Sequence, residues 1–245
     1  MDLATTTWTD AEAAGAEVAL LPVGSTEQHG PHAPLGTDTL NAETVADAAA
    51  DRYDDPVVVA PAIPVGVAEE HRRFPGTLWT SESTFRSYVR DVVTSLATHG
   101  WDRVVVVNGH GGNVGPLREV TARIVRHDEA YAVPFTWFEE VGDRSPAMGH
   151  AGPRETSLLR FAVPETVHED RLEAAAEGGS DRWGEWQGSV NLAVDSDEFT
   201  ENGVVGDPRE SDADLGADLR DAAAEALCAL LDAVRERDPS PRADE

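Results

Sequence analysis

The sequence predicts an α/β fold in which helices cover both faces of a parallel sheet. Four short runs of the chain are apolar throughout and rich in β-branched residues, as expected of strands that are covered on both faces. Segments with helical patterns follow these runs, and this alternation is typical of a parallel sheet. With 245 residues, the chain is long enough to bury a sizeable core in one domain of this class.

The expected elements follow one another in a regular order. Strands are predicted at residues 16–23, 56–65, 103–108 and 130–138. Helices are predicted at residues 38–53, 81–100 and 115–130, in the segment that starts near Pro153, and from about Ser211 onward. We assign residues 1–236 to one domain and expect the polar, acidic tail 237–245 to be disordered.

The chain is strongly acidic. It carries 46 acidic and 19 basic residues, all of the latter arginine, for a formal net charge of −27. Such a surface repels nucleic acids and anionic membranes, so neither is expected as a partner. The acidic residues are scattered over the whole chain. This favours a surface suited to concentrated salt, as in halophilic proteins, over a functional acidic patch.

The chain shows no sign of export or membrane insertion. Its first ten residues, "MDLATTTWTD", lack the basic and apolar regions of a signal peptide, and no apolar segment approaches the length of a membrane span. The single cysteine, Cys228, lies in an apolar helical stretch and is interpreted as a small buried hydrophobe. These features predict a cytoplasmic protein.

Side chains able to bind protons or metals follow each predicted strand. They are Glu27, His29 and Asp38 after the first strand, Glu70 and His71 after the second, His110 after the third, and His150 and Glu155 after the fourth. Because the carboxyl ends of parallel strands meet at one edge of a sheet, we expect these groups to converge.

Carboxylates and imidazoles without sulfur are ligands suited to Zn, Mn or Fe(II). Asp38 could bridge two ions through its two oxygens, and two ions would make water nucleophilic near neutral pH and polarise a carbonyl group. His150 is a candidate proton shuttle to a leaving nitrogen, and Glu155 could orient His150 or bind a metal. Gly111 and Gly112, in the turn "NGHGGN", would let the backbone pass close to the metals and the substrate.

Several of these residues could instead have a purely structural role. Glu27, His29 and Asp38 could belong to a polar loop that caps the helix after it. His71 and Glu70 could form an ion pair at the surface.

The same is true of the histidines and acids later in the chain. His110 could lie in a turn built around glycine, and Glu155 could be a first-turn acid of its helix. We interpret His32 as an exposed residue or one that supports the metal ligands from outside. We expect Trp183 and Trp186 to be packing or subunit-contact residues rather than a platform for substrate.

Two rival chemistries are weakly supported. A serine triad would need a G-x-S-x-G elbow, which "GSTEQ" at Ser25 does not provide, and Ser157 lies within a predicted helix. The glycine-rich segment "GHGGNVG" before a helix could bind phosphate, but it lacks the lysine of a P-loop.

Five segments together resemble the creatininase (creatinine amidohydrolase) family. They are "LPVGSTEQHGPHAPLGTDT", "EEHRRFPGT", "VVNGHGGN", "HAGPRETSLL" and "NGVVGDP", in family order over roughly residues 15–210. The resemblance implies a three-layer α/β/α sandwich with a mostly parallel central sheet, usually assembled as a homohexamer. It also implies a metal-dependent hydrolase of C–N amide bonds, with a small-molecule or short-peptide substrate.

The resemblance assigns a role to most of the candidate residues. Glu27, Asp38 and His110 would hold one divalent ion, and His29 and Asp38 would hold a second. The catalytic residues would be His150 and the acid that follows it, Glu155. Glu70 and His71 would lie at the rim of the site, where the substrate binds, together with Gly111 and Gly112.

The chain departs from enzymes that act on creatinine at two positions. Gly112 stands where they carry an acid, so the second ion loses a ligand and could recruit Glu155 instead. Ala68 stands where a serine is usual, which removes a hydrogen bond to the substrate. Creatinine is therefore disfavoured as the substrate.

Two other branches of the family fit the motifs better. One contains peptidases that trim the C-terminus of the mycofactocin precursor peptide, and the other contains deformylases of a formylamino-pyrimidine ribonucleotide. We favour the peptidase, because "TENGVVGDP" is close to its pattern and only Arg72, Arg73 and Arg154 are available for an anionic nucleotide. Creatinine amidohydrolase proper is a further alternative. A non-catalytic metal-binding homologue is the alternative from a different functional class.

Overall fold

The centre of the molecule is a four-stranded parallel sheet. The computed structural model describes residues 1–144 and 148–240. The strands are β1 (Val18–Val23), β2 (Val57–Val59), β3 (Arg103–Asn108) and β4 (Tyr131–Thr136), in the order β2-β1-β3-β4. Val18 pairs with both Val57 and Arg103, and Arg103 pairs with Tyr131. All four strands therefore start at one level, and their carboxyl ends open at the same edge of the sheet.

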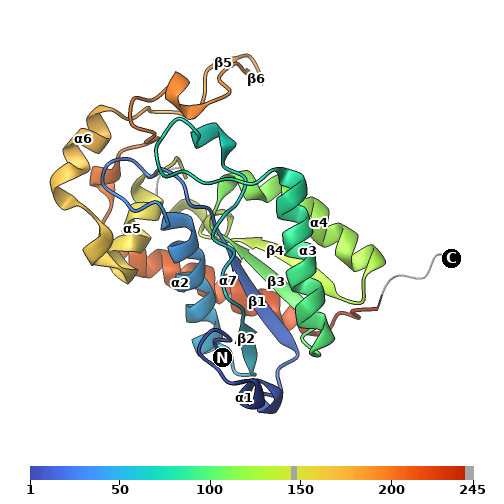
Figure 1. Cartoon of the computed structure of the whole chain (residues 1–245). Helices are drawn as coiled ribbons and strands as arrows, with labels where there is room; N and C mark the ends of the chain where they lie inside the picture. Colours follow the sequence, from blue (N-terminus) through green and yellow to red (C-terminus); the bar gives the residue numbers. More distant parts are fainter. Residues whose placement is uncertain (145–147, 241–245) are drawn as a thin grey trace.

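Helices cover both faces of this sheet (Figure 1). The α-helices are α1 (Trp8–Ala13), α2 (Thr37–Arg52), α3 (Glu82–Thr98), α4 (Val114–His127), α5 (Pro153–Ala162), α6 (Leu172–Glu177) and α7 (Ala213–Arg235). Val18 and Leu20 of β1 pack in a core with α2 and α7, whereas Ala19 and Leu21 pack in a second core with α3 and α4. Because successive strand residues point to opposite faces, one strand contributes to both cores. The expected three-layer α/β/α sandwich is confirmed.

Most predicted elements agree with the structure to within a few residues, but the second strand does not. Instead of residues 56–65, β2 has only three residues, and a single bridge between Val23 and Ile63 follows it. Pro61 and Pro64 lie in this segment, and proline lacks the N–H that a central strand donates. The segment from Ala60 onward is therefore a loop, which leads the chain toward the short 3₁₀ turn Glu69–His71.

The region from residue 171 to residue 208 closes over the carboxyl edge of the sheet (Figure 1). It contains α6 and a short antiparallel hairpin, β5 (Trp186–Gln187) and β6 (Val190–Asn191), which the sequence patterns did not predict. Its last part is tied to the loop before α5, because the backbone groups of His150 and Val205 hydrogen-bond to each other in both directions.

The strand order creates a crevice at the carboxyl ends of β1 and β3. The chain leaves β1 toward β2 and later returns to the other side of β1, so the loops after β1 and β3 diverge, and ligand sites of α/β sheets lie at this point. Gly109 lets the start of α2 approach closely, since a Cβ atom there would lie 2.1 Å from the carbonyl oxygen of Asp38. The first turn of α2 is thereby held beside the loop that carries His110.

Within residues 1–144 and 148–240, no helix is both long enough and apolar enough to cross a membrane. Residues 241–245, which make up the end of the tail predicted to be disordered, lie outside the described part of the chain.

Candidate metal centre and active site

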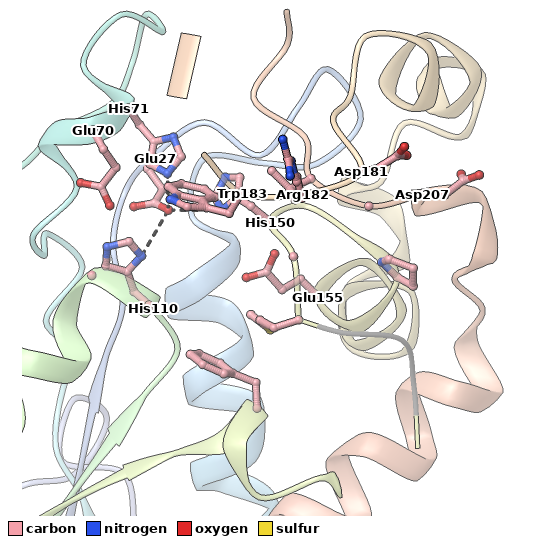
Figure 2. A pocket seen from close by; sticks show the side chains of 18 of the residues that line it. Glu27, Glu70, His71, His110, His150, Glu155, Asp181, Arg182, Trp183 and Asp207 are labelled. Carbon is pink, nitrogen blue, oxygen red and sulfur yellow. Dashed lines mark ion pairs between the residues drawn. The ribbon is translucent and has the colours of Figure 1, made fainter. Parts of the chain in front are cut away.

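The structure brings the predicted site residues together at the carboxyl edge of the sheet. Figure 2 shows Glu27, Glu70, His71, His110, His150 and Glu155 among them. Glu27 and His29 lie on the loop after β1, Asp38 in the first turn of α2, and His110 in the turn after β3. All of these side chains are buried, as are those of His71, His150 and Glu155. Helix α2 starts at Thr37, with Gly36 as its N-cap residue and no side-chain cap, so the alternative that this polar loop caps the helix through a side chain is wrong.

Asp38 stands between two groups of potential ligands. Its Oδ2 atom lies 3.2 Å from His110 Nδ1, which is also 3.2 Å from Glu27 Oε1. Its Oδ1 atom lies 3.1 Å from His29 Nε2, which is 3.7 Å from Glu155 Oε1. The two oxygens of one carboxylate therefore face two separate sets of nitrogen and oxygen atoms, which is the arrangement of a bridging ligand.

These groups contain buried polar atoms that lack a hydrogen-bond partner in the described structure. They are both carboxylate oxygens of Glu27, the Oδ2 atom of Asp38 and the Nε2 atom of His29. Burial of such atoms without a partner is costly. Divalent cations such as Zn or Mn accept this nitrogen and oxygen ligand set. The residues present therefore fit a pair of divalent cations, one on each side of Asp38.

The tautomers of three imidazoles are set by backbone carbonyl groups. His29 Nδ1 donates to the carbonyl oxygen of Glu27 (3.2 Å), His110 Nε2 to that of Val67 (2.6 Å), and His150 Nε2 to that of Gln28 (2.6 Å). When each ring is neutral, its other nitrogen therefore carries the lone pair and faces the centre.

Glu155 is an acid that faces the His29 side of Asp38. Its Oε2 atom accepts the backbone N–H of Ala151 (2.6 Å), which leaves Oε1 to face His29. No side chain fits at Gly112 without a backbone shift, since a Cβ atom there would lie 2.2 Å from the carbonyl oxygen of Val67 and 2.6 Å from His110 Nε2. The same carbonyl group anchors His110.

The Gly112→Ala variant is expected to lose stability and metal affinity, because the new Cβ atom must break the bond from His110 Nε2 to the Val67 carbonyl group. We expect a loss of about 1–3 kcal/mol of unfolding free energy and a roughly 10- to 100-fold weaker zinc affinity. Thermal unfolding and zinc titration measure both. Gly111→Ala is the matched control, since its Cβ atom would meet nothing within 4 Å. Equal behaviour of the two variants would contradict this account.

Zinc binding is expected to release protons near neutral pH. Burial lowers the pKa of His29 and of His110, but the facing carboxylates raise both pKa values well above the ordinary 6.5. Below those raised values a cation competes with protons, so the zinc affinity rises with pH until the two imidazoles titrate. Calorimetric titration in buffers of different ionisation enthalpy should show up to two protons released per chain. A binding heat that does not depend on the buffer would contradict this expectation.

His71 and Glu70 do not form the surface ion pair that was considered. His71 is buried, its Nε2 atom lies 3.5 Å from Glu27 Oε1, and its ring stacks on that of His150 with centroids 4.4 Å apart. Glu70 is partly buried beside the same pocket, and burial raises the pKa of its carboxyl group.

A cavity of about 720 Å³ opens above these residues. Its wall includes Glu70, His71, Gly111, Gly112, His150 and Glu155, as the sequence predicted for the site. Trp183 also lines it, with its ring 5.6 Å from that of His71 and 6.1 Å from that of His150, whereas Trp186 is exposed on the β5–β6 hairpin. The expectation that Trp183 serves only in packing or subunit contact therefore misses its place in the cavity.

The far side of the cavity is acidic. Asp181 and Asp207 lie there, away from His110 (Figure 2), and Glu210 belongs to the same wall. Asp207 binds Arg209 through both oxygens, whereas Arg182 is the arginine that lines the cavity in the described part of the chain. Asp207 belongs to the family segment "NGVVGDP", but the sequence analysis assigned a site role to none of these residues.

Two further candidates, His32 and Ser157, contact other parts of the fold. His32 is buried rather than exposed, and its Nε2 atom lies 3.0 Å from Thr156 Oγ1; burial, followed by the nearby His29, lowers its pKa to about 4. Ser157 Oγ accepts the backbone N–H of Asp212 at the start of α7, and this contact gives no support to a serine triad.

Known proteins resemble this chain over most of its length. The sequence matches the creatininase family, described as creatinine amidohydrolase, over residues 4–231. The mycofactocin precursor peptide peptidase of Mycolicibacterium smegmatis is 40% identical over 159 residues, which are 62% of this chain and 61% of that protein. The creatinine amidohydrolase of Pseudomonas putida is 30% identical over 194 residues, 68% of this chain and 73% of that protein. The match thus spans only about three-fifths of the length of the peptidase.

Solved structures extend the likeness to the whole fold. A structure named "Creatininase Mn" has a TM-score of 0.77 and 25% identity, and it covers 98% of this chain and 99% of that chain. A mutant creatininase of the Zn-Zn type has a TM-score of 0.79 at 24% identity and covers 98% of each chain. The matched residues 4–231 include all the acids and imidazoles around Asp38. The resemblance found in the sequence motifs is confirmed, and the chain belongs to the creatininase family.

Proposed function

We propose that the protein is a metal-dependent amide hydrolase that trims the C-terminus of a mycofactocin-type precursor peptide. The observation that carries the proposal is the position of Asp38 between two buried ligand groups, whose members Glu27, His110 and Glu155 line the cavity. The 40% identity to mycofactocin precursor peptide peptidases supports the choice of substrate.

In this proposal the centre takes two divalent cations, which are Zn, Mn or Fe. Glu27, Asp38 and His110 would hold one, and Asp38, His29 and Glu155 would hold the other. When bound, such cations make water nucleophilic near neutral pH and polarise the carbonyl group of an amide.

His150 has the properties of a proton shuttle. Its Nε2 hydrogen is engaged by the Gln28 carbonyl group, so Nδ1 carries the lone pair that faces the cavity. Burial and the neighbouring His29 lower its pKa, which keeps the ring neutral near pH 7. His150 Nδ1 can thus accept a proton from the attacking water and deliver it to the leaving nitrogen.

The size and charge of the cavity favour a peptide over the alternative substrates. A volume of about 720 Å³ suits a ligand of drug size, and creatinine would occupy little of it. The arginines considered for a nucleotide are otherwise engaged. Arg72 and Arg73 face Asp195 at 2.8 and 3.8 Å, and Arg154 donates to the carbonyl groups of Phe138 and Gly142. These contacts disfavour the deformylase alternative.

A panel assay tests the proposal. The zinc- or manganese-loaded protein in molar KCl is given a Val-Tyr-ending precursor peptide, the formylamino-pyrimidine ribonucleotide and creatinine. We expect hydrolysis of the peptide alone, and no hydrolysis after chelation of the metal. If another compound of the panel is hydrolysed instead of the peptide, that compound is the substrate and the peptidase assignment is wrong. Metal binding without turnover of any amide would favour the non-catalytic homologue.

We further propose that the protein works as a homohexamer in the salt-rich cytoplasm of its cell. The net charge of −27 and the absence of lysine support the high-salt setting. Exposed apolar side chains on and beside the β5–β6 hairpin, namely Trp186, Val190, Leu192 and Val194, support a subunit contact there. Light scattering across a KCl series measures both the assembly and its dependence on salt.

A further inference from the structure

His71 differs from the three imidazoles that are anchored by backbone carbonyl groups. Its outer nitrogen, Nδ1, lies 2.9 Å from the side-chain Nε2 atom of Gln28 and 3.0 Å from Ser196 Oγ. All three side chains are buried. Which ring nitrogen of His71 carries the hydrogen therefore depends on whether one of these neighbours donates to Nδ1.

The backbone fixes the orientation of the Gln28 amide. Its Oε1 atom accepts the N–H of Gly30 at 2.9 Å, and its Nε2 atom donates to the carbonyl oxygen of Gly203 at 3.1 Å. A backbone N–H only donates and a carbonyl oxygen only accepts, so the amide cannot be turned around. Gly203 has φ +86°, and a Cβ atom there would lie 1.9 Å from Gln28 Oε1, so this loop lies directly against the amide. Gln28 Nε2 must therefore donate to His71 Nδ1.

Ser196 is compatible with this assignment. Its hydroxyl lies 3.0 Å from the carbonyl oxygen of Glu70 as well as 3.0 Å from His71 Nδ1. Because a hydroxyl group rotates, it can donate to either acceptor. Gln28, whose orientation is fixed, therefore determines the tautomer of His71.

The consequence is that His71 carries its hydrogen on Nε2, the atom that lies 3.5 Å from Glu27 Oε1. By distance alone, Glu27, His71 and His150 form a third set of potential metal ligands. A nitrogen that carries a hydrogen has no lone pair for a metal. The hydrogen bonds at Nδ1 thus remove His71 from the ligands and point its Nε2–H group toward Glu27.

We propose that the Nε2–H group of His71, which faces Glu27 Oε1 at 3.5 Å without forming a hydrogen bond, orients this carboxylate through its dipole, and that Gln28 is a positioning residue that holds His71 in this state. The proposal rests on the metal centre of the proposed function and adds that the centre takes two cations, not three. Gln28 acts on both members of the stacked imidazole pair. Its carbonyl group accepts from His150 and its amide donates to His71, so an acceptor ring and a donor ring lie side by side.

The test uses the zinc-loaded protein with ¹⁵N-labelled histidine. Long-range ¹H–¹⁵N spectra report which ring nitrogen carries hydrogen, and the His71→Asn variant identifies the signals of His71. We expect a hydrogen on Nε2, none on Nδ1, and two zinc ions per chain by elemental analysis after equilibration with excess zinc. A wild-type His71 with its hydrogen on Nδ1, or with three zinc ions bound, would overturn the proposal.

The Gln28→Glu variant should reverse the tautomer. The new carboxylate accepts a hydrogen from His71 Nδ1, the lone pair moves to Nε2, and a third zinc ion binds per chain. Ser196→Ala is the matched control in the same buried contact, and it should keep both the tautomer and the count of two. A tautomer that depends on Ser196 and not on Gln28 would overturn the assignment.

A second variant covers the case in which a carboxylate facing the Gly203 carbonyl group prevents folding. Gln28→Met removes the donor without adding charge, so His71 should populate both tautomers. The turnover number should then fall about 10- to 100-fold, as for other residues that orient metal ligands. If His71 keeps its single wild-type tautomer in this variant, Gln28 does not position it. Because the spectra need no substrate, they decide this role even if the peptide is not hydrolysed.

Discussion

Replacing His110 with alanine is expected to remove one of the two cations and to abolish turnover. The Nδ1 atom of His110 faces Glu27 and Asp38 at equal distances of 3.2 Å, so in the proposed centre it would be the nitrogen ligand of one cation. A catalytic cation supplies several kcal/mol of transition-state stabilisation, which corresponds to a loss of roughly a thousandfold or more. Elemental analysis should show one zinc ion per chain instead of two.

His127→Ala is the control for this experiment, because His127 is exposed at the end of α4. It should keep both cations and full activity. An active His110→Ala protein with two bound cations would show that the centre lies elsewhere.

Replacing His150 with glutamine should lower the turnover number by about 10²- to 10⁴-fold while both cations remain bound. Burial and His29 lower the pKa of His150 below 6.5, so the wild-type ring becomes protonated, and the activity falls, only as the pH drops through that lowered value. This acidic limb of the pH–rate profile should disappear in the variant.

The count of bound cations separates the two roles that the geometry allows His150. Its ligand atom lies close to those of His29 and Glu155, which makes another possible set of ligands. If His150→Gln loses a cation together with its activity, His150 is a ligand and the proton shuttle must be another group. His127→Gln, at the exposed end of α4, should change neither quantity.

Much of the fold could be predicted from the sequence, because buried parallel strands are apolar throughout and the helices between them are amphipathic. The edge of the sheet at which Glu27, His110 and His150 meet followed from that topology alone. The length of β2 could not be predicted, since the apolar run continues past Ala60 and only the prolines mark where pairing with β1 ends.

The positioning contacts could not be predicted from the sequence. Gln28 meets His71 across 43 residues and Gly203 across 175, and no local pattern encodes such pairings. Glutamine also carries no charge that would single it out as a candidate. The loops around Trp183 had no periodicity to interpret, so their place over the cavity emerged only from the three-dimensional structure.

The segment from Glu27 to His29 leaves no room for a change in length. Its first and third side chains face His110 and Asp38, while the middle residue contacts two rings through its carbonyl group and its amide. Inserting or deleting one residue here would place a different residue in each of these contacts and so disrupt all of them together. We therefore expect insertions and deletions among relatives to occur in the exposed β5–β6 hairpin and not in the segment from Glu27 to His29.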